Sequence, residues 1–155
     1  MAVRITIVVG ALGSLAAVLW LPWATYGSID IPLHRFPGWT FHVAAVTVLY
    51  GAALWALLRP PARRALPLAV CGVAGLVAAG SAVTIASRYD DPTSLFDGIF
   101  PAILPVLGSG GPVAVLSVLV SLAALAVLTA RTSDTPTRTD DLPRRPGTVA
   151  RQLDG

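Results

Sequence analysis

Residues 39–87 read WTFHVAAVTVLYGAALWALLRPPARRALPLAVCGVAGLVAAGSAVTIAS, and this stretch decides the fold. Its two apolar segments, 39–58 and 65–87, contain no Asp, Glu, Lys or Arg and are separated only by RPPARR at 59–64. A hydrocarbon core about 30 Å thick requires about 20 residues of α-helix. The tandem prolines end the first segment, and the short connection predicts two antiparallel membrane helices packed side by side.

Two further segments, 5–21 and 112–130, have the same length and apolar character. Backbone groups in lipid must be satisfied internally, so we expect helices in all four. The chain is 55% hydrophobic and 12% charged, whereas a soluble domain carries about 25% charged residues. We therefore predict an all-α fold, with a transmembrane four-helix bundle over residues 1–131. A polar cytoplasmic tail, 132–155, follows, and we expect it to be disordered because it has too few large apolar residues to form a core.

The arginines predict the orientation. Cytoplasmic flanks of membrane helices carry an excess of basic residues. Nine of the eleven arginines fall on one side of the predicted spans: Arg4, Arg59, Arg63, Arg64, Arg131, Arg138, Arg144, Arg145 and Arg151. Only Arg35 and Arg88 fall on the other side. We expect a multi-pass plasma-membrane protein with both termini in the cytoplasm and loops 22–38 and 88–111 facing outward.

Aromatic residues surround the exit of the first span, where LPWATYG occupies residues 21–27. Indole and phenol rings have an apolar body and a polar tip, which favours the level of the lipid headgroups. We interpret Trp20, Trp23, Tyr26 and Trp39 as such an interfacial belt, with a ligand cage as the alternative. The tryptophan-rich exit is a poor cleavage site, so we expect the first segment to remain as a span.

The second outward loop reads RYDDPTSLFDGIFPAILPVLGSGG at 88–111. Asp91 followed by Pro92 is typical of a helix start, and Leu95, Phe96, Ile99 and Phe100 then share one face at helical spacing. We predict a short amphipathic interfacial helix that is either a packing lid or a binding surface, followed by a flexible break at Gly108–Gly111.

Catalytic and metal-binding patterns are weak. His34 and His42 are eight residues apart across a Pro-Gly turn, which matches no compact ligand motif. The middle of each span lacks ionisable residues, and no phosphate loop or catalytic triad is visible. We expect no enzymatic activity, no cofactor, no metal and no nucleic-acid partner.

Small residues four apart predict how the helices pack. Gly10 and Ser14, Gly75 and Ala79, and Ser117 and Ser121 follow this spacing, which lets helix backbones approach closely. Because residues 71–82 are the richest in small residues, we expect the third span at the bundle centre. These faces could pack within one chain or between copies, so a homo-oligomer stays open.

The favoured hypothesis is a non-enzymatic interaction or scaffold protein in the lipid bilayer, with a membrane or envelope protein as partner. Its candidate interaction surface comprises Trp23, Tyr26, His34, Trp39, Leu95, Phe96, Ile99 and Phe100. The alternative is a small oligomeric transporter or channel component.

Three short motifs carry a family resemblance: LWLPWATY at 19–26, RPPARR at 59–64 and LGSGGPVAVLS at 107–117. Their order resembles small four-span actinobacterial membrane proteins, in particular the tryptophan-operon-associated membrane protein family. The resemblance implies a plasma-membrane protein and no catalytic residues.

Overall fold

A computed structural model describes residues 2–91, 95 and 103–133, and four helices dominate this part of the chain. They are α1 (Ala2–Leu19), α2 (Trp39–Leu58), α3 (Ala65–Ala86) and α5 (Gly110–Ser133). All four are long and apolar enough to cross a membrane. The predicted helical bundle is therefore confirmed, with each span displaced by no more than three residues from its predicted limits. The predicted tail lies outside the described residues, apart from the last turn of α5.

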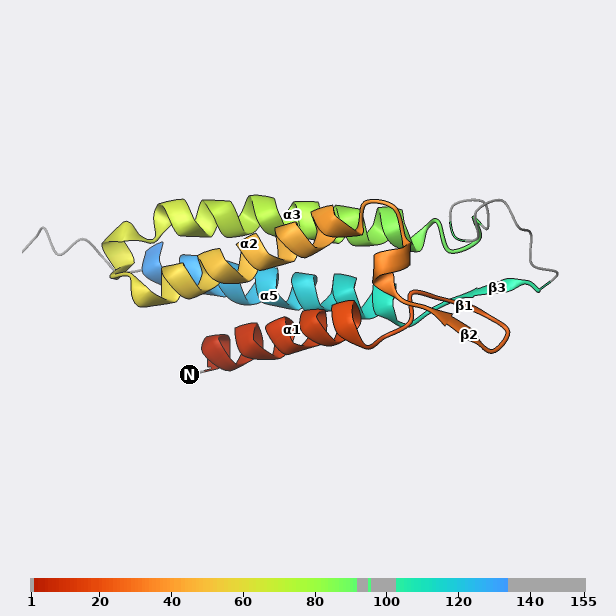
Figure 1. Ribbon diagram of the computed structural model, residues 1–155. Helices are drawn as coiled ribbons and strands as arrows, with labels where there is room; N and C mark the ends of the chain where they lie inside the picture. Colours follow the sequence, from red (N-terminus) through yellow and green to blue (C-terminus); the bar gives the residue numbers. More distant parts are fainter. Residues whose placement is uncertain (1, 92–94, 96–102, 134–155) are drawn as a thin grey trace, which may run out of the picture.

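The helices run along one common axis (Figure 1). The short 3₁₀ helix η2 (Pro61–Arg63) joins α2 to α3 and makes them antiparallel neighbours, as the RPPARR sequence predicts. α3 packs between α2 and α5, while α1 packs mainly against α5. The small residues of the third span thus predict its central place correctly, but α5 is equally central. We call the end that carries η2 the turn end.

The opposite end carries a small β-sheet that the all-α prediction missed, and we call it the sheet end (Figure 1). Its strands are β1 (Ala24–Tyr26), β2 (Ile29–Ile31) and β3 (Pro105–Leu107), in the order β2-β1-β3 with antiparallel pairing. Gly27, at a φ of 63°, makes the turn between β1 and β2. Strands of three residues are too short to show an alternating pattern, and β3 lies about 80 residues from its partner in sequence.

Close packing of α1 against α5 depends on small residues. A Cβ on Gly10 would collide with the hydroxyl of Ser121, and a Cβ on Gly13 would collide with that of Ser117. At the next interface, a Cβ on Gly75 would lie 2.5 Å from a methyl carbon of Leu122. The small-residue faces therefore mediate packing within one chain.

Candidate functional site

The sheet presents two different faces. Ala24 and Tyr26 of β1 are buried, whereas Thr25 between them is partly exposed. The cross-strand partners of Thr25 are Asp30 in β2 and Val106 in β3, and both are exposed. Since side chains alternate along a strand, one face of β1 packs onto the bundle and its other face is open.

Trp23, just before β1, anchors the sheet to the helices. Its side chain is fully buried, and its indole Nε1 donates a hydrogen bond to the carbonyl oxygen of Ala17, 2.8 Å away. Its backbone N–H donates to Ile31 at 2.9 Å, and its carbonyl accepts from Gly108 at 3.0 Å. The headgroup interpretation is therefore wrong for Trp23, because the ring packs inside the protein. It is also wrong for Tyr26, which is buried in the same cluster.

The glycines at 108–111 make room for this indole. A Cβ on Gly110 would lie 2.5 Å from Cδ1 of Trp23, and a Cβ on Gly111 would lie 2.9 Å from the Cβ of Ala86. Gly110 also donates a backbone hydrogen bond to Pro22 at 2.8 Å. This stretch is a close packing contact rather than the predicted flexible break. Two of the motifs that carry the family resemblance thus touch each other.

His42 lies beside Trp23 in the first turns of α2. The two rings meet edge to face, with centroids 5.4 Å apart and an interplanar angle of 71°. Nδ1 of His42 lies 3.1 Å from the carbonyl oxygen of Ala78 and 3.0 Å from the hydroxyl of Ser81. The side chain is fully buried and joins α2 to α3.

These contacts favour one tautomer of His42. A carbonyl oxygen only accepts hydrogen bonds, and the hydroxyl of Ser81 donates its own proton to Ala78 at 2.9 Å. The contacts therefore favour the tautomer with the hydrogen on Nδ1, in which Nε2 is an acceptor. Among the described residues, Nε2 has no hydrogen-bond partner.

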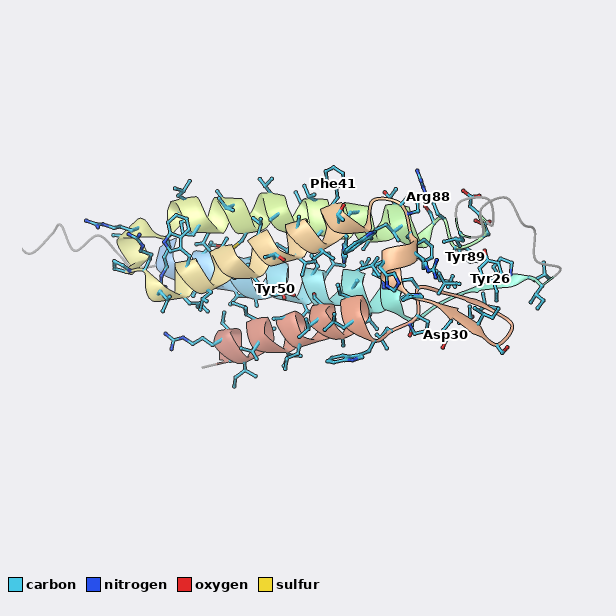
Figure 2. All side chains as sticks on the ribbon, in the orientation of Figure 1. Tyr26, Asp30, Phe41, Tyr50, Arg88 and Tyr89 are labelled. Carbon is cyan, nitrogen blue, oxygen red and sulfur yellow. The ribbon has the colours of Figure 1, made fainter. Side chains whose placement is uncertain are left out.

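Tyr26 ties the sheet to the end of α3. Its hydroxyl donates to the carbonyl oxygen of Tyr89 at 2.8 Å, and both tyrosines lie at the sheet end in Figure 2. Burial raises the pKa of Tyr26 above its ordinary value, and the nearby carboxylates of Asp90 and Asp91 raise it further. The ring therefore stays neutral and keeps its donor proton.

Several predicted surface residues are accessible. His34, in the 3₁₀ helix η1 (Leu33–Arg35), and Trp39, at the start of α2, are both exposed. With Asp30, Arg35 and the half-buried Leu95, His34 lines a hollow of about 310 Å³. Trp20, which the belt interpretation also includes, is 73% exposed. The predicted interfacial helix and its residues Phe96, Ile99 and Phe100 lie outside the described residues.

The prediction missed an exposed apolar patch on and beside the sheet. It consists of Ile103, Leu104 and Val106, which we call the strand patch. Ile29 is also exposed, but it pairs with Tyr26 and lies on the other face of the sheet. Leu104 is 86% exposed and Val106 is 62% exposed, although neither lies in a membrane-length helix. The apolar run ILPVL at 103–107 is the signal that could have indicated it.

A second polar group lies in the middle of the bundle, where Figure 2 labels Tyr50. The Tyr50 hydroxyl lies 3.0 Å from that of Ser14 and 3.1 Å from that of Ser121, while Ser121 donates to the carbonyl of Ser117 at 2.8 Å. The hydroxyls of Ser14, Tyr50 and Ser121 therefore form one hydrogen-bonded chain. These bonds connect α2 with α1 and α5.

In the described ranges, no three His, Cys, Asp or Glu side chains gather closely enough to hold a metal ion. Cys71, the cysteine of the chain, is buried and lies 3.7 Å from the carbonyl oxygen of Leu49. Among the described residues, the sheet end therefore consists of a packed interior and an exposed apolar surface.

Comparison with protein families, curated proteins and solved structures finds no match for this chain. The resemblance to the tryptophan-operon-associated family therefore stays a prediction.

Proposed function

We propose that this multi-pass protein lies in the plasma membrane, with the turn end in the cytoplasm and the sheet end outside. The positions of the arginines support this orientation. Arg4, Arg59, Arg63 and Arg64 belong to the turn end, whereas Arg35 and Arg88 belong to the sheet end. Basic residues accumulate on the cytoplasmic side of short membrane loops. Green fluorescent protein fused after the tail should therefore fluoresce, and an alkaline phosphatase fused there should be inactive. The reverse pattern would contradict the orientation.

We propose further that the protein is a non-enzymatic interaction protein, and that the strand patch is where a membrane or envelope protein binds. The exposure of Leu104, directly before β3, and of Val106, within β3, is the observation that carries this proposal. Large exposed apolar groups outside a span are typical of interaction sites.

The position of the patch favours a protein over lipid as its occupant. Thr25 and Asp30 share the open face of the sheet with Val106. Burying a carboxylate among acyl chains is unfavourable, whereas a protein partner can pair it with a donor. Trp23 and Tyr26 already fix the sheet to the bundle through hydrogen bonds, so a partner would lose little free energy in ordering the sheet.

Site-directed photocrosslinking in the native membrane tests this surface. A photoreactive phenylalanine analogue at position 106 should give one discrete product with a second protein. The same analogue at Leu12, which is exposed on α1, should label lipid. Leu104→Asp should abolish the product at position 106 and the co-purification of that protein.

Other outcomes would count against the proposal. A product containing only a second copy of this chain would favour the alternative, a small oligomeric transporter or channel component. Equal labelling at positions 12 and 106 would mean that the strand patch faces lipid.

A further inference from the structure

A groove runs along the seam between α2 and α3. Its larger part has a volume of about 500 Å³ and is lined by apolar side chains, among them Ala44, Ala45 and Val48 of α2 and Val73, Ala74 and Val77 of α3. The groove exists because alanines face each other where larger side chains would meet. It opens on the outside of the bundle, among residues that face lipid in a membrane-spanning chain.

A second hollow of about 320 Å³ continues the groove toward the sheet end, and Phe41 lines both parts. Its lining changes from apolar to polar, with Ser81, Thr84 and Arg88 of α3. These three residues continue the helical stripe begun by Val73 and Val77, since residues three or four apart share a helix face. Figure 2 labels Phe41 and Arg88 along the same upper edge of the molecule, with Arg88 nearer the sheet.

The length of the groove along α3 matches the thickness of one leaflet of a bilayer. Ten residues separate Thr84 from Ala74, which corresponds to about 15 Å at 1.5 Å per residue. Half of a hydrocarbon core is also about 15 Å. The polar part of the groove therefore lies at headgroup level when the alanine-lined part lies beside the acyl chains.

The polar end of the groove contains the cationic side chain of Arg88. In the described part of the chain, the exposed guanidinium of Arg88 forms no hydrogen bond or ion pair. Asp90 and Asp91 are close to Arg88 along the chain, and neither lines this hollow. Pro37 and Gly38 form the opposite rim directly before the first turn of α2.

We propose that this groove binds a phospholipid with an anionic headgroup, which places its phosphate at Arg88 and one acyl chain between the alanines of α2 and α3. The inference depends on the helices spanning a membrane and is independent of any protein partner at the strand patch. A failure of one proposal therefore leaves the other intact.

Native mass spectrometry of the full chain in mild detergent tests it, using phosphatidylglycerol and phosphatidylcholine with identical acyl chains. Phosphatidylglycerol should bind about fivefold more tightly, as one arginine near a phosphate allows. Arg88→Gln should remove this preference, because it should weaken phosphatidylglycerol binding more than phosphatidylcholine binding. Arg35→Gln is the matched control at the same end of the bundle and should change neither. Excess inorganic phosphate should not displace the lipid.

Filling the groove provides a second, independent readout. Ala44→Leu should weaken the binding of both lipids, and Ala69→Leu should do the same if the first variant does not fold. Equal binding of the two lipids by the native chain would overturn the proposal, as would an unchanged preference in Arg88→Gln or an equal loss in Arg35→Gln. Displacement by phosphate alone would show an anion site rather than a lipid site.

Discussion

The indole Nε1 of Trp23 donates a hydrogen bond to the carbonyl oxygen of Ala17, in the last turns of α1, at 2.8 Å. Trp23 follows α1 in sequence, yet its ring packs between α1, the sheet and the glycines that open α5. Trp23, which the sequence predicts to be an interfacial membrane anchor, therefore holds the sheet against the bundle.

Trp23→Ala should destabilise the fold strongly. The variant loses a fully buried aromatic side chain and leaves a cavity, so we expect a cost of about 3 kcal/mol or more. Unfolding by sodium dodecyl sulfate in mixed micelles, followed by circular dichroism, measures this cost. Trp20→Ala is the control and should change stability little, because Trp20 is largely exposed. Equal effects would contradict the packing role of Trp23.

Gly10→Ala should weaken the packing of α1 against α5. The added Cβ would meet the hydroxyl of Ser121 and lie 2.9 Å from the carbonyl oxygen of Ser117. Overpacking of this kind costs about 1–3 kcal/mol. Gly51→Ala meets nothing within 4 Å and should instead stabilise its helix by up to about 1 kcal/mol. The two variants should therefore shift the same micelle unfolding transition in opposite directions, and a shared direction would refute the contact.

Tyr50→Phe should uncouple three helices in the bundle centre. It removes the hydrogen bonds to Ser14 and Ser121, and we expect a loss of about 1 kcal/mol. A double-mutant cycle with Ser14→Ala should give a coupling free energy of about 0.6 kcal/mol. Thr47→Val is the control, since Thr47 is exposed and bonds only within its own helix. A coupling of zero would mean that the two hydroxyls do not interact.

Stability should fall above pH 10 because of Tyr26. Below about pH 10, the ordinary pKa of tyrosine, the ring is neutral in both the folded and the unfolded chain, and its contribution is fully present. Above that pH the unfolded chain ionises first, because the folded pKa is raised, so stability is lost as pH rises. Absorbance at 295 nm reports the titration.

Tyr26→Phe should be less stable at neutral pH by about 1 kcal/mol, because its hydrogen bond to Tyr89 is lost. Its stability should also decline less steeply above pH 10 than that of the native chain. Asp90→Asn and Asp91→Asn should each lower the pKa of Tyr26. An unchanged titration in both variants would show that the carboxylates do not act on the ring.

The helices were predictable because each span satisfies its own backbone hydrogen bonds, which makes length and composition sufficient evidence. The turn at 59–64 was predictable for a similar reason, since proline acts on its own backbone and its immediate neighbours. Small-residue spacing also predicted that Gly10 and Ser14 lie in a helix interface.

The sheet end was not predictable in this way. Trp23 and Trp39 are both tryptophans near the end of a span, yet one is buried and the other exposed. Whether an indole faces lipid or protein depends on the glycines at 108–111, and nothing near Trp23 in the chain reveals their position. The strand patch was not predictable for the same reason, because β3 forms only by pairing with β1.

By itself, the sequence determined four membrane-length helices and the tight α2–α3 hairpin, since these follow from local composition and from a solvent without hydrogen-bond partners. Only the tertiary structure decided which aromatic residues are buried, how His42 joins α2 to α3 and where an exposed apolar strand lies. These features depend on contacts between residues tens of positions apart, and short-range sequence patterns do not indicate which distant residues are in contact.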